Sequence, residues 1–72
     1  MDKKLIYKKI GRNIQNERKK LGLTQENFAE LMDVSWSYVA KIEGGFQNFS
    51  IGKLIDIAGY LKIDVSELLK LD

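Results

Sequence analysis

Hydrophobic side chains recur at helical spacing in five stretches of the chain, and short polar segments separate these stretches. Positions i, i+3, i+4 and i+7 lie on one side of an α-helix, so each stretch predicts a helix with one apolar face. The first helix is expected from about Leu5 to Leu21, and the second opens at Thr24. The third follows Ser35, the fourth follows Ser50, and a short last helix begins at Asp64. The pattern therefore predicts a compact all-α domain of five helices.

The second and third helices form the centre of this arrangement. Thr24 and Ser35 each have a side-chain oxygen that can accept a hydrogen bond from an unpaired amide at a helix start. The turn between the two helices requires one residue with positive φ, and Asp33 is the expected occupant, since Asp and Asn tolerate that conformation best after Gly. Gly44-Gly45 is expected to end the third helix. Two short helices joined by a tight turn are therefore predicted here.

One side of the first helix carries a charge where an apolar residue is expected. Ile6, Ile10 and Ile14 form a row at i, i+4, and Arg18 is the next member of this row. An unpaired charge on a buried face is very unfavourable. The sequence therefore predicts a partner of opposite charge for Arg18.

The fourth helix has two apolar edges. Ile57 and Tyr60 lie on one of them, and this edge is left over once the inward stripe is assigned. The inward stripe is predicted to consist of Ile51, Leu54, Ile55, Ala58 and Leu61.

The charges are distributed unevenly along the 72 residues. Residues 1–22 carry eight Lys or Arg against two acidic residues, whereas residues 23–72 carry four against eight. A cationic segment of this kind attracts a phosphate backbone. The alternative is an ordinary solvated helix face.

The composition excludes several classes of protein. The chain has no Cys and no His, which excludes a disulfide framework, a zinc knuckle and acid–base catalysis by histidine. No apolar run approaches the roughly 20 residues that a membrane span requires. We expect a single cytoplasmic, non-enzymatic domain over residues 1–72, without a metal, a cofactor or a small-molecule ligand.

A set of residues along the chain carries a resemblance to a known family. These residues are Gly22-Leu23-Thr24-Gln25, Ala29, Val34-Ser35, Tyr38-Val39, Ile42-Glu43, Gly45, Asn48 and Ser50. On them, the chain resembles the lambda-repressor-like (Xre/Cro) helix-turn-helix family over roughly residues 8–69. Its length and its Gln47–Ser50 loop are also similar to those of the small controller proteins of restriction–modification systems. The resemblance implies a helix-turn-helix unit at about residues 24–44.

The resemblance also implies roles for individual residues. In the family, the second helix crosses the phosphate backbone of DNA and the third lies in the major groove. The base-facing residues are then Ser35, Trp36, Ser37 and Lys41. The phosphate-facing residues are Gln25, Tyr38, Gln47, Asn48 and Ser50, together with Lys8 and Lys9 from the cationic first third.

Several of these roles have alternatives. Lys41 can donate to guanine acceptors or make a plain phosphate contact. Trp36 can pack on a thymine methyl group or a sugar, and the alternative is a packing residue or a protein contact. Gly44 stands where the family often has a basic or amide residue, so one phosphate contact is missing there. Arg18 and Glu43 match the family's buried ion pair, which assigns them to structure.

One recognition helix reads too few base pairs to select a single genomic site, so we expect a homodimer that reads two half-sites about 34 Å apart. The predicted function is sequence-specific binding of double-stranded DNA at a short pseudo-palindrome, as a restriction–modification controller or a phage- or plasmid-type repressor that blocks or touches RNA polymerase. The alternative function is a protein-interaction module, such as an antitoxin, that kept the fold without reading DNA. The candidate dimer interface consists of Ile57, Tyr60, Ile63, Val65 and Leu68, whose alternative role is closure of the core.

Overall fold

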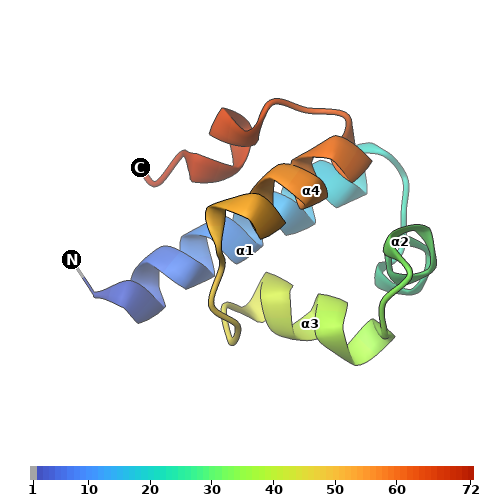
Figure 1. Ribbon diagram of the computed structural model, residues 1–72, viewed down its shortest axis with the longest axis horizontal. Coiled ribbons are helices and arrows are strands. Elements are labelled where there is room, and N and C mark those ends of the chain that lie inside the picture. The colour runs from blue at the N-terminus through green and yellow to red at the C-terminus, as the bar shows by residue number, and fades with distance from the viewer. Residues whose placement is uncertain (1) are drawn as a thin grey trace.

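The computed structural model describes residues 2–72 as four α-helices followed by a 3-10 helix. The elements are α1 (Lys3–Lys20), α2 (Gln25–Met32), α3 (Trp36–Gly44), α4 (Ile51–Leu61) and the 3-10 helix η1 (Val65–Leu69). The predicted all-α class is confirmed, but the fifth element is a short 3-10 helix and not an α-helix. Figure 1 shows α1 running through the middle of the molecule, with α4 in front of it, α3 along the lower edge and η1 along the upper edge.

The helix boundaries follow from the caps that the sequence provides. The side chains of Asp2, Thr24, Ser35 and Ser50 each accept a hydrogen bond from a backbone amide at the start of a helix. Asp33 has φ 57°, as predicted for the turn between α2 and α3. Gly45 ends α3 at φ +80°, and Gly22, which follows α1, has φ +73°.

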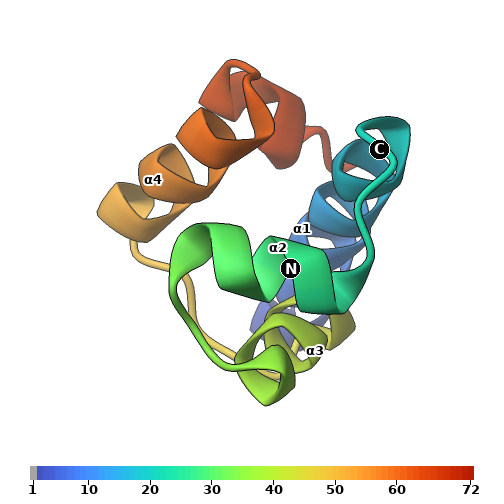
Figure 2. The same ribbon diagram turned by 90° about the vertical axis from the view of Figure 1, so that its right-hand side faces the viewer.

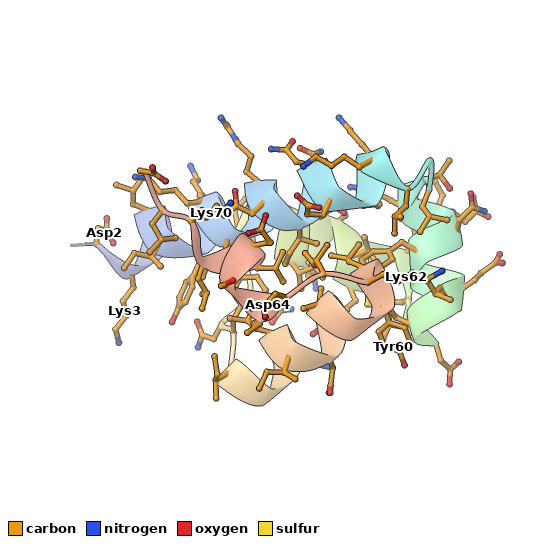
Figure 3. All side chains as sticks on the ribbon, turned by 90° about the horizontal axis from the view of Figure 1, so that it is seen from above. Asp2, Lys3, Tyr60, Lys62, Asp64 and Lys70 are labelled. Carbon is orange, nitrogen blue, oxygen red and sulfur yellow. The ribbon has the colours of Figure 1, made fainter. Side chains whose placement is uncertain are left out.

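Side chains of α1 hold the C-terminal end of the chain by donating hydrogen bonds to backbone carbonyl oxygens of that end. The Asn13 side-chain amide donates to the carbonyl oxygens of Leu68 (3.0 Å) and Lys70 (2.8 Å). At the start of η1, the Ser66 amide donates to the Asp64 carboxylate and lowers the pKa of that carboxyl group below its ordinary value. Figure 3 shows Lys70 over α1, and its bond to Asn13 places it beside the middle of that helix, although the two segments are far apart in the sequence.

A single hydrophobic core lies between the helices. Its fully buried side chains come from every element: Ile14 of α1, Phe28 of α2, Val39 and Ile42 of α3, Ile57 and Leu61 of α4, and Leu68 of η1. Within residues 2–72, no helix combines the length and the apolar composition that crossing a bilayer requires.

The inward face of α4 differs from the predicted one. Leu54, Ile57, Ala58 and Leu61 are buried, whereas Ile51 and Ile55 are 60% and 54% exposed. Both sets satisfy the helical spacing, and packing against α1, α2 and η1 selects the set that contains Ile57.

Because a different face of α4 turns inward, part of the predicted dimer interface is wrong. Ile57 and Leu68 belong to the core of one chain, so neither is available to a second copy. Ile63 and Val65 are half-buried against the same core, and Tyr60 remains 42% exposed. The exposed apolar surface of α4 therefore includes Ile51 and Ile55 in place of Ile57.

Gly11 lies where α1 crosses the C-terminal end of α3. A Cβ atom on Gly11 would collide with the carbonyl oxygen of Ile42 and would lie 2.5 Å from that of Glu43. At the next contact along α1, a Cβ atom on Gly45 would lie 2.7 Å from the Cα atom of Lys8. The two backbones are therefore in direct contact, and this contact sets the position of α3 on the domain.

Candidate nucleic-acid interface

The side of α3 that carries Ser37 and Lys41 faces away from the other helices. Figures 1 and 2 both show α3 at the lower edge of the molecule, and within residues 2–72 no other element lies beneath it. Val39, Ile42 and Glu43 point inward and are buried, while Ser37 and Lys41 are exposed on the opposite side. The helix therefore offers a hydroxyl group and an ammonium group to a partner.

A buried ion pair holds α3 from behind. Arg18 donates from Nε to one oxygen of Glu43 (2.7 Å) and from Nη2 to the other (3.0 Å). Its Nη1 donates to the carbonyl oxygen of Leu23 at 2.6 Å, so all three guanidinium nitrogens are used. The predicted ion pair is confirmed, and it joins the end of α1, the start of the segment leading to α2, and the end of α3.

Two further side chains extend this network to the surface. The Gln25 amide donates from Nε2 to Oε1 of Glu43 at 3.0 Å, and the Trp36 indole donates from Nε1 to Oε1 of Gln25 at 3.1 Å. Gln25 sits at the first position of α2 and Trp36 at the first position of α3. This series of hydrogen bonds, which runs from Arg18 through Glu43 and Gln25 to Trp36, therefore fixes the starts of α2 and α3 relative to each other.

The other flank of α3 contains Tyr38 and the start of α4. The Lys53 ammonium lies 5.5 Å from the centre of the Tyr38 ring, within the range of a cation–π interaction. Ser50 caps α4 by accepting the Lys53 amide, with Asn48 exposed and Gln47 half-buried in the preceding loop. Lys53 is missing from the predicted site residues, because its sequence position gives no sign that it lies beside Tyr38.

Comparison with known proteins identifies this arrangement. A family profile described as helix-turn-helix matches residues 14–68. The chain belongs to the helix-turn-helix family. Its helix-turn-helix unit is α2, the turn at Asp33 and α3.

Three relatives match more than four fifths of the chain. The control protein C.MunI of a Mycoplasma species is 38% identical over 61 residues, which are 83% of this chain and 82% of that protein. The crystal structure of the restriction–modification controller protein C.AhdI from Aeromonas hydrophila superposes with a TM-score of 0.84 at 32% identity, covering 94% of this chain and 99% of that one. A helix-turn-helix family transcriptional regulator from Vibrio cholerae has a TM-score of 0.84 at 28% identity and covers 99% of this chain but 40% of its own. These relatives are named as regulators, in line with the prediction of a non-enzymatic chain.

The loop after the helix-turn-helix unit contains a residue that the predicted site omits. Phe46 is 78% exposed, and its ring lies over Gly44, where a Cβ atom would come within 2.8 Å of it. The glycine that departs from the family pattern thus leaves room for an aromatic ring at the C-terminal end of α3. Tyr7, Lys4 and Lys8 line the same hollow as Phe46.

The structure separates two lysines that were predicted to act together. Lys8 is exposed and lies against Gly45 at the end of α3. Lys9 donates its ammonium group to the carbonyl oxygen of Leu71 at 2.7 Å, on the side of α1 that holds the chain end. Adjacent positions on a helix point about 100° apart, so only Lys8 shares a side with α3.

Proposed function

We propose that this helix-turn-helix protein is a sequence-specific regulator that binds double-stranded DNA as a homodimer. The observation that carries the proposal is the exposed outer face of α3, with Ser37 and Lys41 at its centre and a buried ion pair behind it. A rigidly held helix with polar groups on its free side suits the major groove, where each base pair presents its own donors and acceptors.

The phosphate contacts that we propose lie on both sides of α3. On one side they come from Gln25 and the start of α2, where helix amides favour an anion. On the other side they come from Tyr38, Asn48, Ser50 and Lys53, with Gln47 behind them. Phe46 and Lys8 extend this surface at the end of α3.

The biological role that we propose is control of a restriction–modification system. C.AhdI and C.MunI support it because the match with this chain covers 99% and 82% of their lengths, so the resemblance extends over most of each relative and not over a shared module alone. The second role that we propose is that of a phage- or plasmid-type repressor, which would use the same DNA-binding surface. In either role the regulator acts in the cytoplasm by blocking or touching RNA polymerase, and its input is its own concentration.

For the homodimer we propose an interface on the outer side of α4. Ile51 and Ile55 are more than half exposed one helical turn apart and form this surface. Tyr60, labelled in Figure 3, is also exposed, but it lies about 140° around the helix axis from Ile55 and so borders the other edge of α4. Exposed branched apolar side chains at this spacing mark an association surface. A two-fold pair then presents two copies of α3 to successive major grooves.

Selection from a random double-stranded oligonucleotide library tests the proposed function directly. The wild-type protein is expected to enrich a short pseudo-palindrome, and Lys41→Ala is expected to relax the preference at one position per half-site. The loss there should be about 1–3 kcal/mol, the usual discrimination of one good base contact. Failure of the wild-type protein to enrich any sequence would refute DNA reading and favour the protein-interaction module.

Lys8 and Lys9 form a matched pair for testing the electrostatic contacts. Lys8→Ala is expected to weaken binding to all sequences alike and to reduce the slope of log K against log salt by about 0.9, the value for one phosphate contact. Lys9→Ala is expected to leave the slope unchanged, because the Lys9 ammonium is bound to the carbonyl of Leu71. Titrations at several salt concentrations provide the measurement, and equal slopes for the two variants would contradict the assignment of Lys8.

The dimer surface is tested by a charge on α4. Ile55→Glu is expected to shift the protein to monomers in sedimentation experiments and to abolish cooperative binding to the two half-sites, because an apolar contact surface would then have to bury an unpaired carboxylate in each copy. Leu21→Glu is the matched control, since Leu21 is 44% exposed outside α4. Dimers of unchanged strength in the Ile55→Glu variant would exclude this face as the interface.

A further inference from the structure

Trp36 is the largest side chain at the start of α3, and its one polar atom is already used. An indole ring has a single hydrogen-bonding group, the Nε1–H donor, and no acceptor. In Trp36 this group donates to Oε1 of Gln25 at 3.1 Å. Trp36 as a whole nevertheless remains 57% exposed. What Trp36 presents to a partner is therefore hydrocarbon.

The hydrogen bonds behind the indole hold it in one orientation. Gln25 is itself bound through Nε2 to Glu43, and Glu43 is bound to Arg18 by two hydrogen bonds. A ring anchored in this way contacts a ligand without first losing side-chain freedom. Turning the Nε1–H group toward a base would break its bond to Gln25, so hydrogen-bond readout by Trp36 is disfavoured.

The major groove contains one apolar group that such a ring can recognise, the 5-methyl group of thymine. Cytosine has only a hydrogen atom in place of this methyl group, and purines present ring nitrogens, amino groups or carbonyl oxygens, which lose water without gaining a partner when they meet hydrocarbon. We propose that Trp36 is a specificity-determining residue that reads the 5-methyl group of a pyrimidine by ring contact. This inference rests on the proposed function, since it requires α3 to lie in the groove.

Polar and apolar side chains of α3 then recognise different groups of the bases. Ser37 and Lys41 carry the hydroxyl and ammonium groups that pair with polar base edges, and Trp36 supplies the apolar contact. Because the contact is to the methyl group itself, 5-methylcytosine in place of cytosine is read in the same way. Binding therefore responds to cytosine methylation at this one position of each half-site.

The experiment uses the intact protein and the duplex enriched from the random library. Each thymine of that duplex is replaced in turn by uracil, which has the same hydrogen-bonding edge and lacks only the methyl group. One position per half-site is expected to lose about fourfold in affinity, the factor for one methyl-sized apolar contact. With a cytosine–guanine pair placed there, 5-methylcytosine is expected to bind about fourfold more tightly than cytosine.

Three variants connect this effect to Trp36. Trp36→Gln is expected to bind the thymine and uracil duplexes equally at that position, whereas Trp36→Phe keeps a ring and is expected to keep most of the difference. Lys41→Ala is expected to weaken binding while the thymine-to-uracil ratio stays as in the wild-type protein.

Two results would overturn the inference while the proposed function stands. One is an enriched duplex in which no uracil substitution reduces wild-type affinity by twofold, which is also the result expected if the ring packs on a sugar. The other is a Trp36→Gln variant that keeps the full thymine preference. A wild-type protein that enriches no duplex would overturn the proposed function and this inference together.

Discussion

Arg18→Met is expected to lower the free energy of unfolding by about 3–5 kcal/mol, the effect of leaving the other member of a buried ion pair without its partner. The side chains of Arg18 and Glu43 are only 7% and 2% exposed. Without the guanidinium group, the buried Glu43 carboxylate keeps a single hydrogen bond, from Gln25. A 72-residue domain has roughly 4–11 kcal/mol of stability in total, so this variant should lose a large share of it and unfold at a much lower urea concentration than the wild type. Urea unfolding followed by circular dichroism measures the change.

Two controls show whether the unpaired charge is the cause. The double variant Arg18→Met/Glu43→Met is expected to recover much of the lost stability, because it removes both buried charges and leaves apolar side chains in their place. Lys20→Met removes the exposed ion pair between Lys20 and Glu17 and is expected to leave the unfolding midpoint unchanged. An Arg18→Met protein as stable as the wild type would show that Glu43 does not depend on its partner.

The second large effect is expected for Gly11→Ala, which should lower the free energy of unfolding by about 1–3 kcal/mol. In an isolated helix the same change would be stabilising by about 1 kcal/mol, because alanine has the higher helix propensity. The sign is reversed here because the new methyl group would collide with backbone carbonyls of Ile42 and Glu43, which cannot turn aside. Relief of the collision requires α1 to move away from α3, so DNA affinity should fall with stability.

Gly59→Ala is the matched control for this variant. Gly59 also lies within a helix, α4, but a Cβ atom there would have no neighbour within 4 Å. This change is therefore expected to raise the free energy of unfolding by about 0.5–1 kcal/mol. Thermal unfolding of both variants at one fixed protein concentration makes the comparison. Shifts of the same sign would show that helix propensity, and not the crossing of α1 and α3, decides the outcome.

The contact between α1 and the C-terminal end of α3 positions the candidate interface. Arg18 and Gly11 lie on the side of α1 that contacts the end of α3. Arg18 binds Glu43 through its side chain, and Gly11 allows the two backbones to approach because it has no side chain. A helix of nine residues such as α3 has little stability by itself in water. Its orientation therefore depends on its contacts with α1 and α2, and these two contacts with α1 are among those that set it.

Local signals in the sequence were enough to predict the helix-turn-helix unit. Thr24 and Ser35 act as N-caps, Asp33 takes the left-handed conformation, and Gly45 ends α3, each as expected. Caps and turns depend on a few neighbouring residues, and their geometry is visible in the residue types. The partner of Arg18 was also predicted correctly, because a charge in an apolar row demands one and the family resemblance names Glu43.

The orientation of α4 and the surroundings of α3 were decided only by the tertiary structure. Two overlapping apolar stripes on α4 fit the helical period equally well, and packing against the other elements chose the one with Ile57. The bond between Gln25 and Trp36, the ring of Phe46 over Gly44 and the separation of Lys8 from Lys9 have the same origin. Periodicity says which residues share a side of one helix. Which side turns inward, and what it meets there, depends on contacts between residues far apart in the chain.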